Sequence, residues 1–118
     1  MPNVTLSLRW LVVDCVDPQG IARFWSAALQ RPIADGGSDW ASIPGSPHLF
    51  FVQVPEPKST KSRLHLDWDS PDREAEVLRL IELGATRHAD REEAALGLAW
   101  TVVSDPEGNE FCVVQADA

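Results

Sequence analysis

The sequence predicts an α+β protein made of two tandem βαβββ modules, because its structural signals occur twice in the same order. A strand-like and helix-like segment from Leu8 to Leu29 recurs 55 residues later, from Arg63 to Gly84. The segment from Trp40 to Phe51 recurs 60 residues later, from Trp100 to Phe111. In each half, three short strand-like segments follow the helix-like one. Such self-similarity is typical of a duplicated unit, and a chain of 118 residues suits one domain over residues 1–118.

The first module spans about residues 6–54 and opens with a strand followed by a helix. The strand covers Leu8 to Val16, where branched apolar residues are frequent. Asp17 and Pro18 then indicate a helix start, because an aspartate caps free backbone N–H groups and a proline fits the first helical turn. The apolar stripe of this helix, at helical spacing, consists of Ile21, Phe24, Trp25, Ala28 and Leu29.

Three short strands complete the first module, and turn residues separate them. They are predicted at Ile33–Ala34, Trp40–Ile43 and Leu49–Val54. Gly36-Gly37 and the segment 44–47, which contains two prolines, supply the turns. Residues 55–62 are the predicted linker between the modules, because their prolines exclude a central strand or a helix interior.

The second module spans about residues 63–116 and begins with strictly alternating apolar and polar residues. Successive side chains of a strand point to opposite faces of its sheet. One face is therefore predicted to carry Leu64, Leu66 and Trp68, and the other His65, Asp67 and Asp69.

The helix of the second module is expected to start at Ser70-Pro71-Asp72, with an acidic cap and with Pro71 in the first turn. Gly84 is its predicted left-handed C-terminal stop. Its apolar face is predicted from Ala75, Val77, Leu78, Ile81 and Leu83. Three strands follow, at Thr86–His88, Leu98–Ser104 and Glu110–Gln115, and a turn at 105–109 joins the last two.

The composition excludes several classes of partner. Ten Lys and Arg residues against eighteen Asp and Glu residues give a net charge of −8. Without a basic run, the chain lacks the surface that nucleic acid or anionic lipid needs, and no apolar stretch is long enough to span a membrane. Cys15 and Cys112 are too few for a disulfide framework, so reduced thiols are expected. The first residues do not resemble a signal peptide, so a cytoplasmic location is expected.

Four segments resemble, in this order, the glyoxalase, bleomycin-resistance and extradiol-dioxygenase superfamily, also called vicinal oxygen chelate proteins. They are Asp17-Pro18 with Phe24-Trp25, His65-Leu66-Asp67, Leu83-Gly84-Ala85, and Asp105-Pro106-Glu107-Gly108-Asn109-Glu110-Phe111. They look most like the small glyoxalase-like branch of that superfamily. The resemblance implies that the two modules form a curled mixed sheet around a cup, with the helices on the outer face and ligands inside. It also implies a homodimer, since a partner often completes the cup.

The resemblance further marks four positions at which metal-using members of the superfamily bind a divalent ion. In this chain they are Trp10 and His65 on the first strands, and Val52 and Cys112 on the last strands. An indole nitrogen only donates hydrogen bonds and a valine has no ligand atom, so two positions cannot coordinate an ion. We therefore expect no metal and no other cofactor. A strand register changed by one residue would alter these assignments, and a cluster of His65, Glu110 and Cys112 stays open as an alternative.

His65 is the candidate catalytic residue. Asp67 and Asp69 share its face of the strand, and a carboxylate beside a histidine can fix its tautomer for acid/base work or for gripping a ligand. Alternatively, the three side chains form the solvated face of a half-buried sheet. Cys112 is either a nucleophile activated by His65 or a small buried side chain. His48, beside a proline in a turn, is predicted to be exposed.

The predicted ligand-binding residues are Trp10, Asp14, His65, Asp67, Glu110 and Cys112. Trp10 is expected to form an aromatic wall of the cup. Trp25 and Trp68 are assigned to the core, and Trp40 and Trp100 either line the cup or pack elsewhere.

The sequence favours binding of a small organic molecule, such as an aromatic compound, for sequestration, resistance or a carrier role. The first alternative is a lyase, isomerase or dioxygenase of the same superfamily, which uses His65 as acid/base or in a non-standard metal site. The second is an assembly or regulatory module.

Overall fold

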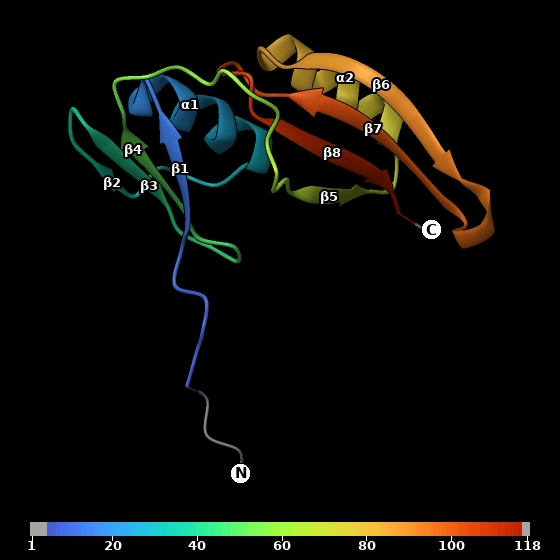
Figure 1. Cartoon of the computed structure of the whole chain (residues 1–118), viewed down its shortest axis with the longest axis horizontal. Helices are drawn as coiled ribbons and strands as arrows, with labels where there is room; N and C mark the ends of the chain where they lie inside the picture. The colour runs from blue at the N-terminus through green and yellow to red at the C-terminus, as the bar shows by residue number, and fades with distance from the viewer. Residues whose placement is uncertain (1–4, 117–118) are drawn as a thin grey trace. The chain divides into compact units, whose positions relative to one another are not determined.

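The computed structural model of the chain describes residues 5–116 and contains two compact units (Figure 1). Unit 1 is Met1–Glu56 and unit 2 is Pro57–Ala118, so their boundary falls inside the predicted linker. Within the described residues, each unit has one α-helix and one four-stranded sheet with mixed parallel and antiparallel pairs. The predicted α+β class with two βαβββ modules is confirmed.

Unit 1 contains, in chain order, β1 (Leu11–Cys15), α1 (Pro18–Leu29), β2 (Asp35–Gly36), β3 (Trp40–Ile43) and β4 (Leu49–Gln53). The strand order in its sheet is β1-β4-β3-β2. β1 runs parallel to β4, whereas the β4–β3 and β3–β2 pairs are antiparallel. A parallel pair needs a long connection, which α1 and the β2–β3 segment provide here.

α1 begins as the sequence predicts, at a capping aspartate followed by a first-turn proline. The Asp17 carboxylate accepts a hydrogen bond from the Gly20 N–H at 3.1 Å, and Pro18 is the first helical residue. The helix packs on β3 and β4, where Phe51 is fully buried. The predicted core position of Trp25 is confirmed, since 6% of this residue is exposed.

Unit 2 repeats this order with a longer hairpin. Its elements are β5 (Asp67–Ser70), α2 (Arg73–Leu83), β6 (Thr86–Glu93), the short 3-10 helix η1 (Ala94–Leu96), β7 (Leu98–Ser104) and β8 (Glu110–Gln115). The strand order is β5-β8-β7-β6, with β5 parallel to β8 and the other pairs antiparallel. Figure 1 shows α2 lying against this sheet.

The start and the buried face of α2 differ from the prediction. The Asp72 carboxylate is the cap and accepts a hydrogen bond from the Ala75 N–H at 3.1 Å, so Pro71 precedes the helix instead of lying in its first turn. The buried side chains of α2 are Val77 and Leu80. The predicted face also includes Ala75, Leu78, Ile81 and Leu83, all of which are exposed. The direction in which α2 crosses the sheet selects the buried stripe, and helical spacing alone leaves that direction open.

The strand ends follow the ends of their partners in the sheet. β1 starts at Leu11, not at Leu8, because Leu11 pairs with Leu49, the first residue of β4. β3, β7 and β8 have the bounds that the sequence predicts. The other corrected ends are β2 at Asp35–Gly36 in place of Ile33–Ala34, β4 ending at Gln53, β5 beginning at Asp67, and β6 continuing to Glu93.

The strand registers correct one part of the predicted repeat. Asp14, Val52 and Trp40 lie side by side on β1, β4 and β3, as Asp69, Val114 and Trp100 do on β5, β8 and β7. The offsets of 55 and 60 therefore hold for the first and third strands, but β8 is offset from β4 by 62 residues. The connection between equivalent positions is two residues longer in unit 2. The structural equivalent of Cys112 is thus Phe50, not Val52.

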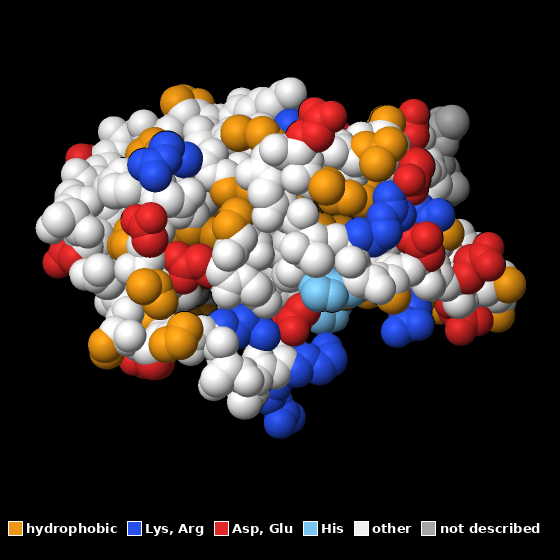
Figure 2. All heavy atoms as spheres, turned by 90° about the horizontal axis from the view of Figure 1, so that it is seen from above, with side chains coloured by type: hydrophobic (Ala, Val, Ile, Leu, Met, Phe, Trp, Pro, Cys, Tyr) orange, Lys and Arg blue, Asp and Glu red, His pale blue; other side chains and the backbone are white. Residues whose placement is uncertain are grey.

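The described surface has mixed character. On the face drawn in Figure 2, acidic and basic side chains are interspersed with small groups of hydrophobic ones. Among the described residues, no helix is both long and apolar enough to cross a membrane.

Candidate functional site in unit 2

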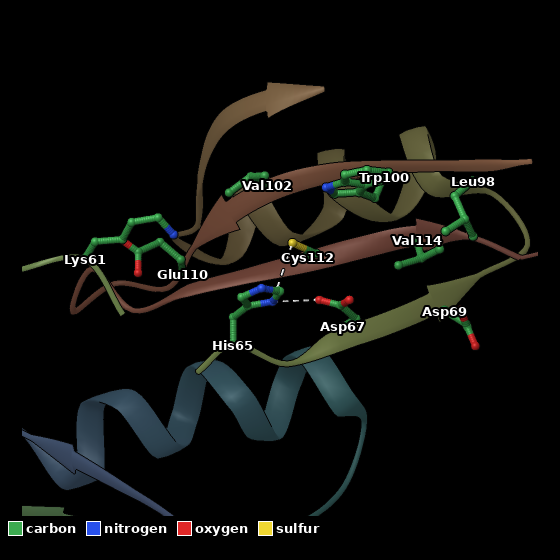
Figure 3. Close-up of a pocket in the computed structure, with 10 residues that line it drawn as sticks. All are labelled: Lys61, His65, Asp67, Asp69, Leu98, Trp100, Val102, Glu110, Cys112 and Val114. Carbon is green, nitrogen blue, oxygen red and sulfur yellow. Dashed lines mark hydrogen bonds and ion pairs between the residues drawn. The ribbon is translucent and has the colours of Figure 1, made fainter. Parts of the chain in front are cut away.

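A pocket of about 570 Å³ lies on the sheet of unit 2 (Figure 3). α2 packs on the opposite face of this sheet, where Val103, Phe111 and Val113 are buried. Because side chains alternate along a strand, the neighbours of these residues point into the pocket. The lining residues come from the linker, the β5 segment, β7 and β8, and are Lys61, His65, Asp67, Asp69, Leu98, Trp100, Val102, Glu110, Cys112 and Val114.

The strand register arranges most of these side chains in two lines across the sheet. The first line is Asp67, Cys112 and Val102, and the second is Asp69, Val114 and Trp100. Each line runs from a carboxylate on β5, through a small side chain on β8, to an apolar side chain on β7. The pocket therefore has one acidic margin and one apolar margin.

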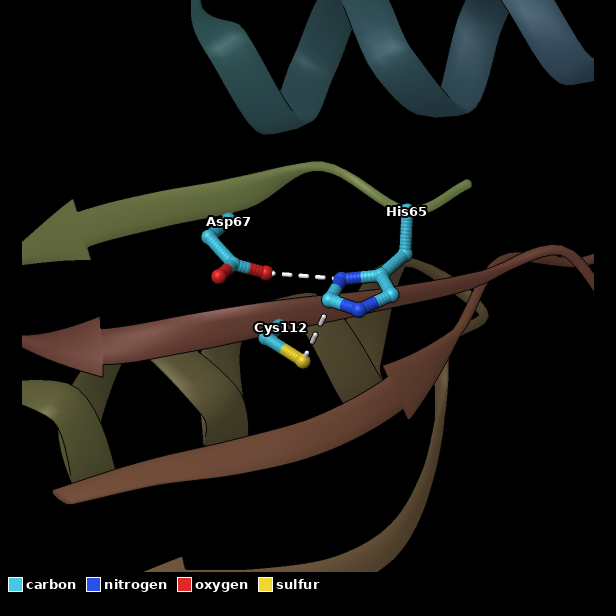
Figure 4. Close-up of side chains that lie close together, drawn as sticks. All are labelled: His65, Asp67 and Cys112. Atoms are coloured by element: carbon cyan, nitrogen blue, oxygen red, sulfur yellow. Dashed lines mark hydrogen bonds and ion pairs between the residues drawn. The ribbon is translucent and has the colours of Figure 1, made fainter. Parts of the chain in front are cut away.

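His65 lies just before β5 and is oriented by Asp67. The Leu66 carbonyl accepts a hydrogen bond from the Cys112 N–H at 2.9 Å, which keeps this segment beside β8. The His65 Nδ1 lies 2.8 Å from Asp67 Oδ1 (Figure 4). Because a carboxylate only accepts hydrogen bonds, Nδ1 carries the proton, and Nε2 of the neutral ring is left as an acceptor or base. The two side chains are 45% and 54% exposed, so the pair is solvated as well as hydrogen-bonded.

Cys112 lies at the base of the pocket as a buried, neutral thiol. The residue is 6% exposed, and its Sγ is 4.0 Å from His65 Nδ1. Burial, together with the negative charge of Asp67, raises the pKa of the thiol to about 11. The nearby imidazole nitrogen already donates to Asp67, so it does not serve as a base for the thiol. This geometry favours a small buried side chain over an activated nucleophile.

Glu110 is held by the linker instead of joining the His65 cluster. Its carboxylate accepts a hydrogen bond from the Ser62 N–H at 3.0 Å and an ion pair from Lys58 Nζ at 3.1 Å. Hydrogen bonds from Ser62 and Lys58 lower the pKa of Glu110 to about 2, against the opposing effect of burial. The contacts tie the linker to the start of β8. The acidic member of the cluster beside His65 and Cys112 is therefore Asp67.

Three donor atoms in the pocket are close enough to hold one cation. A ring nitrogen of His65, a carboxylate oxygen of Asp67 and Cys112 Sγ lie within 4.8 Å of one another. Nitrogen, oxygen and sulfur ligands suit Zn²⁺, and three protein ligands are usual in catalytic zinc sites. Such an ion would polarise an oxygen atom of a bound molecule. Binding it requires the loss of the thiol proton and of the His65–Asp67 hydrogen bond.

The four positions inherited from metal-using relatives do not fit a divalent ion. Trp10 and Val52 offer no ligand atom, and Phe50, which the register places opposite Cys112 in the repeat, offers none either. The corrected register therefore leaves the sequence-based argument intact, and the absence of a metal stays a prediction.

The two remaining predicted ligand-binding residues belong to unit 1. Trp10 is 40% exposed and stacks on Phe50 at 4.9 Å between ring centroids, and Phe50 stacks on Trp40 at 5.3 Å. Asp14 is exposed on β1. His48 is half-buried, contrary to the prediction, and its Nε2 lies 2.7 Å from the Ser42 hydroxyl.

Sequence reasoning missed several pocket residues. Leu98, Trp100 and Val102 alternate along β7, and Val114 follows Cys112 at the same spacing. The spacing of two was visible in the sequence, but which of the two faces of β7 meets the pocket depends on how α2 packs. Lys61 gave no signal, because a linker has no periodicity.

A family model described as the glyoxalase-like domain matches residues 10–114 of the chain. Among curated proteins none matches.

Several solved structures share the fold at low sequence identity. A glyoxalase/bleomycin resistance protein/dioxygenase family enzyme from Burkholderia phytofirmans PsJN is 17% identical, with a TM-score of 0.75 over 89% of this chain and 94% of that chain. A fosfomycin resistance protein from Mesorhizobium loti is 14% identical, with a TM-score of 0.74 over 97% and 95%. A bleomycin-binding protein from Streptomyces verticillus, complexed with copper(II)-bleomycin, is 17% identical, with a TM-score of 0.66 over 98% and 100%.

Proposed function

Because the chain belongs to the glyoxalase-like domain family, within the vicinal oxygen chelate superfamily, we propose that it binds a small organic molecule in the unit 2 pocket. Binding does not require the divalent ion of metal-using relatives. The biological role is sequestration, resistance or carriage of that molecule. The bleomycin-binding and fosfomycin resistance proteins of the same fold support this class of role.

The pocket itself is the observation that carries the proposal. Its volume of about 570 Å³ is within the usual range for small-molecule sites. An apolar wall with a few polar groups on one side is also the usual composition of such sites. Here Trp100 and Val102 form part of the wall, while His65 and Asp67 supply hydrogen-bonding atoms.

Filling the pocket tests the proposal. Titration with a panel of small aromatic compounds is expected to change the tryptophan emission of the wild-type protein, because Trp100 lines the pocket. Val114→Phe places a larger side chain in the pocket and is expected to abolish the change. Leu78→Phe, on the exposed face of α2, enlarges an apolar side chain elsewhere and is the matched control. An unresponsive wild-type protein, or equal responses from both variants, would contradict the proposal.

Trp10 and Asp14 remain proposed ligand-binding residues. The stack of Trp10 on Phe50 supports an aromatic surface in unit 1. Trp10→Ala is expected to abolish the emission change without unfolding the protein, as circular dichroism would report. An unchanged titration curve would remove both residues from the proposed site.

A second candidate function is an enzyme of the same superfamily, and the His65–Asp67 pair favours it. His65 Nε2 is available as a general base, and His65 with Asp67 and Cys112 provides the alternative of a non-standard metal site. Metal analysis of protein purified without chelator separates the candidates. Tightly held zinc, iron, nickel or manganese at one ion per chain favours the enzyme, and substoichiometric metal favours the metal-free binder. Loss of bound metal in Cys112→Ser would locate the ion.

We also propose a cytoplasmic location. Cys15 and Cys112 are both free and buried, which supports a reducing environment without requiring one.

A further inference from the structure

The two margins of the pocket differ in charge, and this difference restricts the kind of molecule that fits. Asp69 lies on the β5 margin, in register with Val114 and, through it, with Trp100 on β7. Neighbouring strands are separated by roughly 4.8 Å, so the carboxylate row and the indole row flank a strip roughly 10 Å wide. Val114 forms the floor of that strip (Figure 3). A single aromatic ring with a short polar arm matches this width.

The other acidic side chains of the pocket already have partners. Glu110 is paired with Lys58, and Asp67 is paired with His65. Among residues 5–116, the structure gives Asp69 no ion-pair partner within 4.0 Å. Asp69 therefore offers a carboxylate to a bound molecule, at the end of the pocket where Trp100 supplies an aromatic face.

Lys61 is the remaining charged side chain of the lining, and it lies at the other end of the pocket. Figure 3 shows it beside Glu110, with Cys112 between it and the Asp69 end. Lys61 belongs to the linker and is exposed. Its charge therefore does not neutralise Asp69 where the apolar wall and the carboxylate face each other.

We propose that the ligand is a small organic cation, an ammonium or amidinium group on an apolar ring. The cationic group contacts the Asp69 carboxylate, and the ring lies over Val114 against Trp100. A cation beside both a carboxylate and an indole gains from ion pairing and from the electron-rich ring face. This inference rests on the proposed function of the same pocket and adds the charge of the molecule that it takes.

Matched small probes test the sign of the charge. Benzylamine, benzyl alcohol and phenylacetate share one ring and differ in carrying a positive, a neutral or a negative group. Binding is followed on ¹⁵N-labelled full-length protein through the indole N–H of Trp100 and the backbone amides of Cys112 and Val114. Benzylamine is expected to bind about three- to tenfold more tightly than benzyl alcohol, the range for one partly exposed ion pair with an aromatic contact. High salt is expected to reduce that ratio.

Variants assign the preference to one carboxylate. Asp69→Asn is expected to bring benzylamine to the affinity of benzyl alcohol while leaving the alcohol unchanged. Glu82→Gln, on an exposed position of α2, changes the net charge of the chain equally and is expected to preserve the preference. The dispersion of amide signals shows whether each variant is folded.

The outcomes separate this inference from the function beneath it. Equal binding of the amine and the alcohol, or tighter binding of phenylacetate, overturns the cation and leaves the pocket as a binding site. A preference for benzylamine that survives Asp69→Asn overturns the role of Asp69. Probes that shift none of the pocket signals remove the proposed function together with the inference.

Discussion

A single buried carboxylate shapes the turn that leads into β8. Asp105 is 4% exposed, and its Oδ1 accepts hydrogen bonds from the backbone N–H groups of Glu107 and Asn109 at 2.9 and 3.0 Å. This explains physically why the Asp-Pro-Glu-Gly-Asn segment is a useful signature. It fixes the point at which β8 begins, and therefore the position of Cys112 in the pocket.

Replacement of Asp105 is expected to cost stability. Asp105→Ala leaves two backbone donors without their side-chain acceptor and should lower the free energy of unfolding by roughly 1–3 kcal/mol. Asp105→Asn keeps one side-chain oxygen as an acceptor, so a smaller loss is expected. Urea denaturation of both variants measures the difference. Equal stability of Asp105→Ala and wild type would show that water replaces the carboxylate without cost.

Glu110 predicts a specific acid sensitivity. Its pKa is lowered from 4.5 to about 2 in the folded protein, so the ionised form is stabilised by folding. That stabilisation is fully present above about pH 4.5 and is lost as the pH falls towards about 2. Glu110→Gln removes this contribution, and its free energy of unfolding should change less steeply over that interval. Glu82→Gln is the control, and parallel curves for wild type and Glu110→Gln would contradict the prediction.

At the level of elements, the two helices end in different ways. Gln30, after α1, has a positive φ of 55°, and Gly84, after α2, has a φ of 122°. Only glycine adopts such backbone conformations without steric cost. The exposed Gln30 therefore carries a strain that Gly84 avoids.

Exchanging the residue types at these two positions should have opposite effects. Gln30→Gly is expected to raise the free energy of unfolding by about 0.5–1 kcal/mol, and Gly84→Ala to lower it by roughly 1–2 kcal/mol. Thermal and urea denaturation of both variants provide the measurement. Changes of the same sign would mean that the effect of glycine on the unfolded chain outweighs strain at both sites.

At the level of the whole molecule, several large apolar side chains are uncovered. Leu6, Leu8 and Leu64 are 91%, 73% and 92% exposed. Single exposed leucines are ordinary, but the superfamily resemblance implies a cup completed by a partner. We therefore propose a homodimer, for which these side chains are candidate contacts.

The mass of the protein in solution tests the dimer. Sedimentation equilibrium is expected to give twice the chain mass of 13.0 kDa. Leu8→Ser, at an exposed position outside any strand or helix, is expected to shift the equilibrium towards the single chain. A mass of one chain at every protein concentration would refute the homodimer.

The order of elements and part of the site were readable without coordinates. Asp17 and Asp72 marked the helix starts, and β3, β7 and β8 have their predicted bounds. Alternation placed His65 and Asp67 on one face, and the structure joins them by a hydrogen bond. Capping and strand alternation depend on residues close in sequence, so the chain itself specifies them.

Tertiary structure alone decided the rest. The offset of 62 for β8, the choice of Val77 and Leu80 as the buried stripe of α2, and the attachment of Glu110 to Lys58 each depend on residues far apart in the chain. Register and helix orientation minimise the free energy of the packed unit as a whole, so no local pattern encodes them. The sequence by itself determined two βαβββ modules with a histidine and an aspartate on one strand face. Packing against α2 determined that this face became the margin of a pocket.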